Sequence, residues 1–245
     1  MNQPGVPFSV ENSSAMRRDY DRFFESNAEE NRKTQYLARN VIPRLKGTAL
    51  DSPLLEVGPG RGALLDVLRK EGYTNLTCFE VCEAFAEKLR ARGFAVASGH
   101  SAVEYFQLLP ESSLGIVFLI DVLEHLPLEE GLIFLRECRR VLNKNGKLII
   151  QTPNASGLFG LNTFVADPTH STPWNELRLT SALRGVGFAK VYCFPMQLPL
   201  GLGNLLRTIA RKPVFAMARF LMRLCGATPV RVLTHNIVCE ASGVL

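Results

Sequence analysis

Three glycines stand at alternate positions directly after a short apolar segment. Leu54–Val57 is followed by Gly58, Gly60 and Gly62, and a segment with helical character begins at Ala63. Glycine lets a ligand approach the backbone closely and permits dihedral angles that other residues avoid. A loop of this kind, between a strand and a helix, is where parallel sheets bind their ligands. The loop therefore predicts a binding site.

Two glutamates near this loop narrow the kind of ligand. Glu80 ends the next predicted strand, 20 residues after Gly60, where a carboxylate can accept hydrogen bonds from both hydroxyls of a ribose. The spacing Gly58-x-Gly60-x-x-Ala63 also fits the dinucleotide fingerprint, so a nicotinamide-dependent oxidoreductase is one alternative. Glu56 argues against it, because a carboxylate there would repel a pyrophosphate. Glu56 instead suits a ligand that presents an ammonium or a sulfonium, unless it only accepts local backbone hydrogen bonds.

A second group of polar residues follows the fourth predicted strand. Asp121, Glu124 and His125 have the spacing i, i+3 and i+4, which places them on one face of a helical turn. Three interpretations are open. In the first, Asp121 orders the cofactor loop while Glu124 and His125 support the fold. In the second, His125 or His170 is a general base. We expect no metal, but a divalent-metal set of Asp121, Glu124, His125 and His170 is the third alternative.

The elements that must position these residues alternate between short apolar strands and helices. Strands are expected at 54–57, 76–81, 94–97, 114–120 and 147–152, and helices at 63–70, 84–92, 102–109 and 128–142. Strands that are apolar throughout are typical of a parallel sheet covered by helices on both faces. The sequence therefore predicts an α/β fold, with the glycine loop and the second polar group at the same edge of the sheet.

The later part of the chain begins with a long loop. This loop follows residue 152, is rich in Asn, Gly, Thr and Pro, and contains His170. Long loops without secondary structure are often functional. Thr172 is expected to cap a helix that begins at Pro173 and ends near residue 184. Two further strands are expected at 188–194 and 235–241, and the helical insert 195–233 lies between them, as two short helices broken by Pro213.

The ordered set of motifs resembles a known family. Glu56-x-Gly58-x-Gly60-x-Gly62, then Glu80, then Asp121-Val122-Leu123-Glu124-His125 is similar to the pattern of class I S-adenosylmethionine-dependent methyltransferases. The last element resembles that of the ubiquinone-biosynthesis O-methyltransferase-like group. The likeness covers about residues 50–194 and resumes at the last strand. It implies a Rossmann-like, mostly parallel sheet of seven strands with helices on both faces, an antiparallel last strand and a helical insert before it.

The resemblance also implies the cofactor and its contacts. The methionine part of S-adenosylmethionine would lie over Gly58, Gly60 and Gly62, Glu56 would serve its polar end, and Glu80 would bind the ribose. Asp121 is a further candidate at this cofactor site. Many relatives carry an acidic residue after the third strand that contacts adenine. This chain has Ser98-Gly99-His100-Ser101 instead, so Ser101 is the candidate there.

The implied reaction transfers the sulfonium methyl group to an acceptor. We expect the acceptor to be a hydroxyl of a small molecule, a saccharide or a lipid-linked group, with His125 and His170 as candidate catalytic residues. A similar metal set with a later histidine occurs in the small-RNA 2′-O-methyltransferases, although there the set begins with Glu and here with Asp121. An RNA 2′-O-methyltransferase with a metal-assisted site is therefore one alternative, and a non-catalytic cofactor-binding module is another.

The basic residues are gathered late in the chain. The formal net charge is +5, yet residues 177–239 contain nine basic and no acidic side chains. The rest of the chain carries 19 basic and 23 acidic residues, so a uniformly basic nucleic-acid binder does not describe it. The segment 198–226 sets basic side chains at i and i+4 among apolar ones. Three interpretations of this segment are open. It is a lid with a solvated basic face, a helix pair that lies on an anionic membrane, or a phosphate contact to nucleic acid, and nucleic acid is the less expected partner.

Composition and cysteines bound the class of protein. The 245 residues are 47% hydrophobic and 21% charged, which suits an N-terminal helical segment (1–50) and one domain (51–245) rather than a disordered or fibrous chain. The six cysteines form no Cys-x-x-Cys pair, so reduced thiols are expected. The N-terminus does not resemble a signal peptide, and no apolar run is long enough for a spanning helix. We expect a cytoplasmic protein, with peripheral membrane contact as an open alternative.

Overall fold

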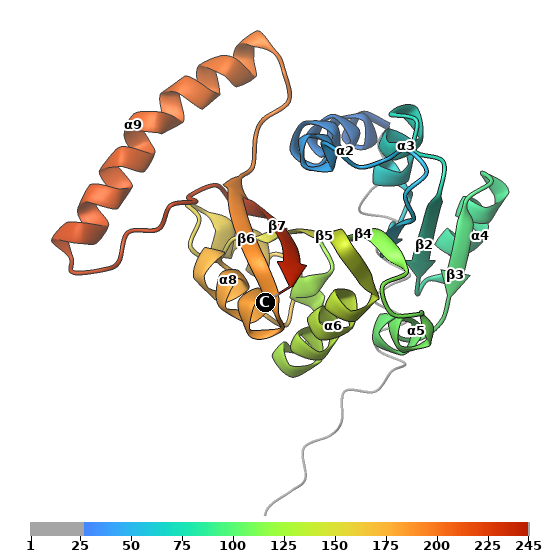
Figure 1. The fold of residues 1–245 in the computed structure, drawn as a ribbon. Helices are drawn as coiled ribbons and strands as arrows, with labels where there is room; N and C mark the ends of the chain where they lie inside the picture. Colours follow the sequence, from blue (N-terminus) through green and yellow to red (C-terminus); the bar gives the residue numbers. More distant parts are fainter. Residues whose placement is uncertain (1–26, 245) are drawn as a thin grey trace, which may run out of the picture.

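Within residues 27–244, which a computed structural model describes, seven strands form one sheet in the order β3-β2-β1-β4-β5-β7-β6 (Figure 1). Side chains are described from residue 32 to residue 243. The strands are β1 (Leu54–Val57), β2 (Leu76–Glu80), β3 (Ala95–Ser98), β4 (Leu114–Ile120), β5 (Leu142–Pro153), β6 (Phe188–Pro195) and β7 (Asn236–Val244). β3, β2, β1, β4 and β5 pair in parallel, and β7 runs antiparallel between β5 and β6. The predicted mostly parallel sheet with an antiparallel last strand is confirmed.

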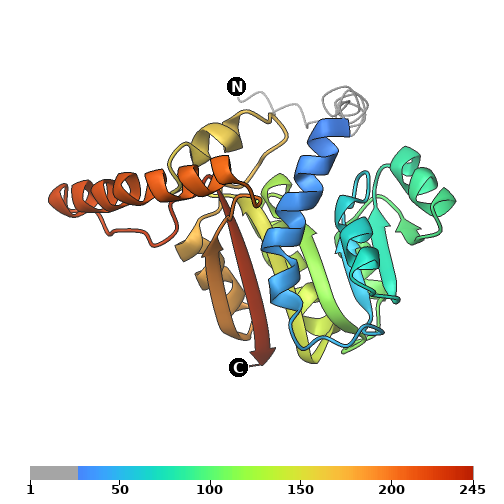
Figure 2. The same cartoon turned by 90° about the horizontal axis from the view of Figure 1, so that it is seen from above.

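Helices cover both faces of this sheet, and short 3-10 turns lie in some of the connections between elements. The helical elements are α2 (Asn27–Asn40), η1 (Ile42–Leu45), α3 (Ala63–Lys70), α4 (Glu83–Ala91), α5 (Ala102–Leu108), η2 (Leu123–His125), α6 (Leu128–Val141), α7 (Gly160–Val165), α8 (Glu176–Gly185) and α9 (Leu202–Leu224). α5, α6 and α8 pack on one face through Phe106, Phe134 and Leu183. α2, η1 and α3 pack on the other through Leu37, Leu45 and neighbouring side chains, and Figure 2 shows α2 lying over the middle strands.

The central strands are apolar throughout because both of their faces are covered. All four residues of β1 and all but one of β4 are buried. Burying one Leu, Ile, Val or Phe side chain stabilises a fold by about 1.5–3 kcal/mol, which explains why these two strands were recognisable from sequence. Glu56 is the exception, because it places a carboxyl group in a strand that is otherwise apolar.

Most of the expected elements occur within a few residues of their predicted bounds. β5 begins five residues earlier than expected, at Leu142, and the loop after β5 is not structureless, because it contains α7. The N-terminal segment 1–50 was expected to be helical. Residues 27–40 form α2 and 42–45 form η1, whereas residues 1–26 lie outside the described residues. α2 packs against α3, so the described part of the N-terminal segment shares the core of the domain.

The helix expected to start at Pro173 starts later. α8 begins at Glu176, and Asn175 caps it by accepting a hydrogen bond from the Arg178 backbone N–H at 2.9 Å. The Thr172 hydroxyl instead donates to a backbone carbonyl of the neighbouring segment, and Trp174 is fully buried beneath it. The Thr-Pro pair has the sequence pattern of a helix cap and a first helical residue. In the structure Thr172 instead holds the loop against the segment after η2, so the predicted start of the helix was wrong.

The prediction of two helices broken by Pro213 was also wrong. α9 is one helix of 23 residues with Pro213 inside it. Proline removes one backbone hydrogen bond and costs about 3 kcal/mol in a helix interior. Here Pro213 lies on the exposed side of the helix, where water can solvate the carbonyl that loses its partner. None of the described helices, α9 included, combines the length and apolar character that crossing a membrane requires.

Candidate active site

The glycine loop lies where the carboxyl ends of β1, β2 and β4 meet. Gly58 and Gly60 have positive φ angles of 63° and 55°, which non-glycine residues rarely adopt. A Cβ atom at Gly58 would lie 3.0 Å from Val122 Cγ2, so the loop passes close to the segment after β4. A Cβ atom at Gly60 would meet nothing within 4 Å. The space beside Gly60 is therefore open to a ligand.

Glu80 fixes the conformation of this loop. Its Oε2 accepts a hydrogen bond from the Gly60 N–H at 3.0 Å, and its Oε1 accepts one from the Cys82 N–H at 2.9 Å. Glu80 is 4% exposed and ends β2 directly beside the end of β1. The predicted proximity of Glu80 to the glycine loop is confirmed, and its carboxylate lies at the edge where a ribose was expected.

Glu56 is a buried carboxyl group with an unfilled hydrogen-bonding capacity. It is 4% exposed, and Oε2 has no hydrogen-bond partner. Burial raises the pKa of Glu56 to about 8, with Glu80 and Asp66 acting in the same direction and Lys33 opposing them. An uncompensated buried charge is costly, so Glu56 favours a ligand that brings a cation to it. A cofactor with an ammonium or a sulfonium fits this requirement.

Two other residues of the predicted cofactor set have structural roles. Gly62 has φ 83° at the start of α3, and a Cβ atom there would lie 2.6 Å from Leu89 Cδ2 of α4. Close packing of α3 on α4 therefore explains the glycine. The Ser101 hydroxyl caps α5 by accepting a hydrogen bond from the Glu104 N–H at 3.3 Å. Contacts of Gly62 and Ser101 with the cofactor stay predictions.

Asp121 does not share a helical face with Glu124 and His125. It stands before η2 with a positive φ of 56°, a strained conformation for a non-glycine residue. Its carboxylate oxygens accept from Gln151 Nε2 at 3.1 and 3.2 Å, and Lys33 Nζ of α2 lies 4.0 Å away. The expectation of one helical turn over 121–125 was wrong, because the chain leaves β4 through a left-handed residue and forms only a short 3-10 turn.

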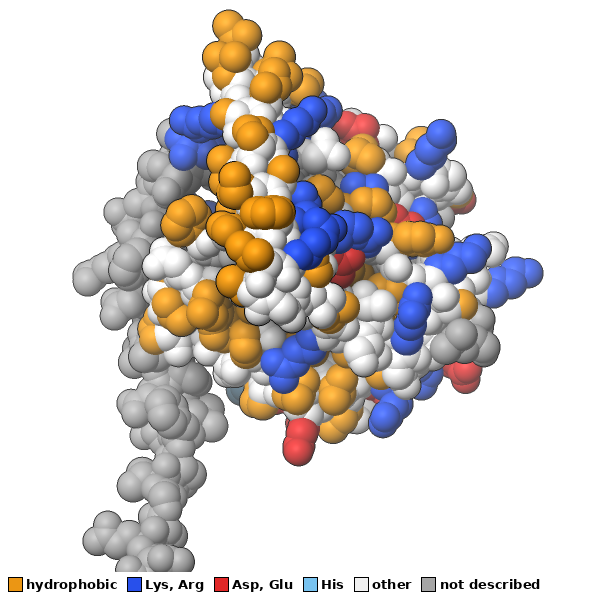
Figure 3. All heavy atoms as spheres, turned by 90° about the vertical axis from the view of Figure 1, so that its left-hand side faces the viewer, with side chains coloured by type: hydrophobic (Ala, Val, Ile, Leu, Met, Phe, Trp, Pro, Cys, Tyr) orange, Lys and Arg blue, Asp and Glu red, His pale blue; other side chains and the backbone are white. Residues whose placement is uncertain are grey.

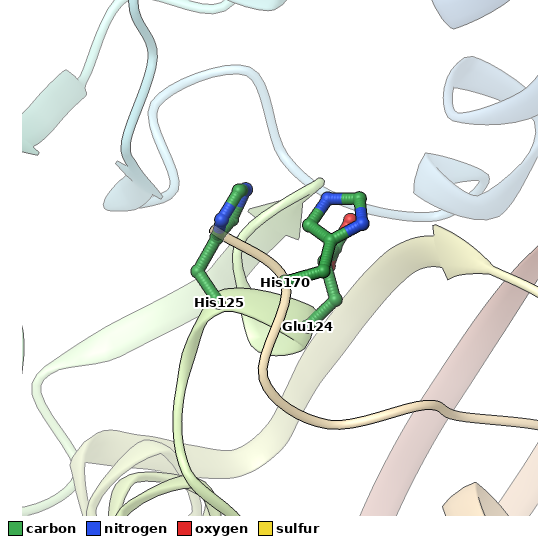
Figure 4. A group of neighbouring side chains, drawn as sticks. All are labelled: Glu124, His125 and His170. Atoms are coloured by element: carbon green, nitrogen blue, oxygen red, sulfur yellow. The ribbon is translucent and has the colours of Figure 1, made fainter. Parts of the chain in front are cut away.

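Glu124, His125 and His170 nevertheless come together. One ligand atom from each of the three side chains lies within 4.8 Å of the others, and the two imidazole centroids are 4.7 Å apart. Figure 4 shows the Glu124 carboxylate and the His125 ring rising from η2, with His170 arriving on a separate loop. His125 and His170, which only the metal alternative placed together with Glu124, thus lie side by side, and Asp121 is not part of this group.

Hydrogen bonds to η2 hold the loop that carries His170. The backbone N–H groups of Ser171 and Thr172 donate to the Glu124 carbonyl at 2.8 and 3.0 Å. The Thr172 hydroxyl donates to the Leu126 carbonyl at 2.7 Å, and the buried Trp174 donates Nε1–H to the Leu123 carbonyl at 3.2 Å. This set of bonds fixes where His170 stands relative to His125.

A hydrogen-bond relay orients the His125 ring. The Thr169 hydroxyl donates its proton to Asp167 Oδ1 at 2.6 Å. Thr169 Oγ1 therefore accepts a hydrogen bond from His125 Nδ1–H, and these two atoms are 2.9 Å apart. That arrangement leaves Nε2 of a neutral His125 free to accept a proton. Burial lowers the pKa of His125, and the neighbouring His170 acts in the same direction. His125 is therefore arranged as a neutral imidazole with a fixed tautomer.

The other two members of the group are also constrained. His170 Nδ1 lies 2.7 Å from the Phe164 carbonyl, to which it donates, and its Nε2 is 3.9 Å from Asp167 Oδ2. Glu124 is 1% exposed, and neither of its carboxylate oxygens has a hydrogen-bond partner. Burial raises the pKa of Glu124 well above its usual range, and Asp121 adds to the effect. Glu124 is thus either protonated or in need of a cation.

Comparison with known proteins identifies the family. Residues 14–192 match the family model described as a methyltransferase domain. The chain belongs to this methyltransferase family. The matched region is a class I S-adenosylmethionine-dependent methyltransferase domain, whose cofactor is S-adenosylmethionine. The sequence-based resemblance is confirmed, and the alternative of a nicotinamide-dependent oxidoreductase is dropped.

Relatives and solved structures agree with this assignment. A protein of Mycobacterium tuberculosis named as a probable S-adenosylmethionine-dependent methyltransferase is 30% identical over 166 residues, which cover 65% of this chain and 56% of that protein. The chain thus spans little more than half the length of the curated relatives it matches. A SAM-dependent methyltransferase from Archaeoglobus fulgidus has the same fold, with a TM-score of 0.66 and 23% identity over 86% of this chain and 93% of that chain.

A second solved structure shares the fold. The 1,6-didemethyltoxoflavin N1-methyltransferase of Burkholderia thailandensis gives a TM-score of 0.60 and 14% identity over 100% of this chain and 94% of that chain. It was solved with 1,6-didemethyltoxoflavin and S-adenosylhomocysteine bound. At this level of identity the likeness concerns the fold, so the acceptor of the present methyltransferase must be argued from its own residues.

Several residues at the site were not apparent from sequence. Lys33 lies more than 20 residues before the glycine loop in the sequence, yet its ammonium is 4.0 Å from the Asp121 carboxylate and lowers the pKa of Glu56. Thr169 and Asp167 flank His170 but serve His125. The only sequence signal for Thr169 and Asp167 was their position in the Asn-, Gly-, Thr- and Pro-rich loop that was already expected to be functional.

Proposed function

We propose that this methyltransferase transfers the methyl group to a hydroxyl of a small molecule, a saccharide or a lipid-linked group. The observation that carries the proposal is the relay from His125 through Thr169 to Asp167, which fixes Nε2 of His125 as a proton acceptor. A hydroxyl loses its proton during methyl transfer, so a base within reach lowers the barrier, typically by a factor of about 10²–10⁴.

The residues of the chain divide the work between binding and proton transfer. Gly60 leaves room for the methionine part of the cofactor, Glu56 offers a carboxylate to its cationic end, and Glu80 faces its ribose. When bound, the cofactor supplies an electrophilic methyl group on a sulfonium. Much of the remaining catalysis is positioning of the acceptor.

On the acceptor side, His125 Nε2 takes up the proton of the hydroxyl. The resulting imidazolium keeps its Nδ1–H on Thr169, and the Asp167 carboxylate at the end of the relay stabilises the positive charge. His170 stands against the same ring and is held by the Phe164 carbonyl. It bounds the acceptor site and is the second candidate for contact with the hydroxyl.

A labelled-methyl screen tests this proposal. The protein is incubated with methyl-labelled S-adenosylmethionine and matched panels of hydroxyl, amine and activated-carbon acceptors, and the product is examined by NMR. We expect an O-methyl product. His125→Asn keeps a donor near the position of Nδ1 but removes Nε2, so turnover should fall about 100-fold or more while S-adenosylhomocysteine binding is kept. Methylation confined to nitrogen or carbon acceptors would refute the hydroxyl assignment.

A second candidate, metal-assisted methyl transfer to a hydroxyl, is favoured by one observation. Both carboxylate oxygens of the buried Glu124 lack hydrogen-bond partners beside two imidazole rings. Carboxylate oxygen and imidazole nitrogen are ligands for zinc and related divalent ions. Zn²⁺ and Mg²⁺ titrations, followed by calorimetry, distinguish this case: binding lost in Glu124→Gln but kept in the exposed control Glu129→Gln would support it. No binding of either ion, together with activity unchanged by EDTA, would reject it.

A further inference from the structure

α9 is attached to the domain by one side only. It lies beyond the β6 end of the sheet, linked by two extended segments (Figures 1 and 2), and contains no buried residue. The side chains that are partly covered include Asn204, Arg211 and Arg219. Asn204 Nδ2 donates to the Pro199 carbonyl at 3.1 Å, and Arg219 Nε donates to the Val230 carbonyl at 3.1 Å. The side of α9 that faces the protein is therefore mixed, because Phe215, Ala218 and Met222 are partly covered as well.

The opposite side of α9 is apolar and faces away from the protein. Its side chains return to one side of the helix at intervals of three, four or eight residues and are 53–76% exposed: Leu202, Leu206, Ile209, Met217, Phe220 and Leu224. Figure 3 shows this apolar stripe running along the helix. An amphipathic helix of a globular domain normally turns its apolar stripe to the core. Apart from Met217, which borders a groove with Leu158, the stripe is not covered by any of the described residues.

Basic side chains border the stripe on both sides. At 100° per residue, Arg207 falls on one border and Lys212 and Arg223 on the other, and all three are exposed. Figure 3 shows basic side chains on both sides of the apolar row. Residues 177–239 contain no acidic side chain that could pair with them. Long basic side chains at the borders of an apolar face can extend to phosphate groups while their stems cover apolar surface.

The apolar surface continues onto α7. Leu158 lines a shallow apolar groove together with Val214, Met217 and other side chains of α9. The next residue, Phe159, is 83% exposed, and Val165 at the other end of α7 is 65% exposed. Two neighbouring segments thus present apolar side chains to solvent, and such a patch marks an interaction surface.

We infer that α9 and the exposed side of α7 form a docking surface for an anionic phospholipid membrane, with α9 lying along the lipid surface. Charge decides between this partner and a second copy of the chain. Pairing two α9 helices would bring Arg207, Lys212 and Arg223 of both copies together with no acid to neutralise them. A layer of anionic headgroups supplies the missing negative charge, and its acyl region takes up the stripe. This inference does not depend on whether the methyl group is transferred to oxygen, nitrogen or carbon.

Vesicle sedimentation of the full chain tests the inference. The probes are phosphatidylcholine vesicles with and without phosphatidylglycerol, at low and at high salt. We expect binding to the anionic vesicles, about tenfold weaker binding to the neutral ones, and loss at high salt because surface charges are then screened. Ile209→Glu/Phe220→Glu should reduce anionic-vesicle binding about tenfold or more. The matched control Leu108→Glu places the same charge on α5, where Leu108 is 83% exposed, and should bind like the wild type.

The charge component has its own matched pair of variants. Arg207→Gln/Lys212→Gln/Arg223→Gln should lose anionic-vesicle binding, whereas Lys70→Gln/Arg136→Gln/Lys144→Gln, also exposed, should keep it. Circular dichroism and S-adenosylhomocysteine binding verify that each variant is folded. Absence of sedimentation with anionic vesicles, or sedimentation unchanged by Ile209→Glu/Phe220→Glu, would overturn the inference. A dimer of the wild type that the same double substitution dissociates would also overturn it, by identifying a second copy as the occupant.

Discussion

Replacing Glu56 by glutamine should change the pH dependence of stability in a calculable way. The pKa of Glu56 is raised from 4.5 to about 8 in the folded protein, chiefly by burial. Above pH 4.5 the unfolded chain releases this proton, whereas the folded chain keeps it until about pH 8. Ionisable Glu56 therefore lowers the free energy of unfolding progressively as pH rises through this window.

The size of the effect follows from the difference in pKa. Each pH unit inside the window costs about 1.4 kcal/mol, because that is the free energy of one unit of proton-binding difference. Glutamine has the same shape and no proton to release. The stability of Glu56→Gln relative to the wild type should therefore improve by about 2–3 kcal/mol between pH 5.5 and pH 7.5. Contributions from other groups cancel in this difference.

Urea unfolding of both proteins at the two pH values measures the effect. Glu87→Gln, an exposed substitution on α4, is the control and should give nearly the same stability difference at both pH values. A difference between Glu56→Gln and the wild type that stays flat from pH 5.5 to 7.5 would refute the reasoning, because Glu56 would then titrate as it does in the unfolded chain.

Ligand binding supplies an independent readout of the same carboxyl group. A cation placed against Glu56 lowers its pKa, so S-adenosylhomocysteine binding near pH 7 should release up to one proton. Calorimetry in buffers with different ionisation enthalpies measures that release, which should be absent in Glu56→Gln. Proton release of equal size in both proteins would assign it to another group.

Three further substitutions test the loop and the relay. Gly60→Ala places a methyl group in open space at a φ of 55°, so S-adenosylhomocysteine affinity should fall about tenfold or more, while stability falls by only about 1 kcal/mol; unchanged affinity in calorimetry would mean that no ligand approaches Gly60. Gly62→Ala drives a methyl group to 2.6 Å from Leu89 Cδ2 at a φ of 83°, so denaturant unfolding should reveal a loss of about 2–4 kcal/mol, and a loss below 1 kcal/mol would contradict the packing argument. Thr169→Val removes the acceptor of His125 Nδ1–H, so turnover of an identified acceptor should fall about tenfold or more with cofactor affinity kept, and full turnover would exclude the relay from catalysis.

The apolar pattern predicted the sheet well because burial on both faces leaves a strong signal. β1 and β4 have their predicted bounds, Glu80 is the last residue of β2, and Glu56 is the last but one of β1. Proline was a less reliable signal than apolar burial, because the same residue occurs both in helices and in loops. Pro173 looked like the first residue of a helix but belongs to the docked loop, and Pro213 looked like a break but lies inside α9.

The catalytic side of the site was harder to predict because it depends on contacts between distant segments. The meeting of His125 with His170 requires Trp174 and Thr172 to be bonded to η2. The left-handed conformation of Asp121 has no marker in the sequence, since Asp is only one of several residues that tolerate it. Motif spacing therefore located the cofactor edge, whereas the acceptor side needed the three-dimensional structure.

The order of the strands has a consequence for how the protein is made. β7, which comes after the other six described strands in the sequence, is an interior strand that pairs with both β5 and β6. Until residues 236–244 emerge, β5 and β6 each lack a neighbour, and the 23-residue α9 has already been synthesised between them. Open strand edges are prone to pair with other chains. The nascent protein thus passes through a stage in which β5 and β6 each present one more unpaired edge than in the folded sheet, and insertion of β7 closes both.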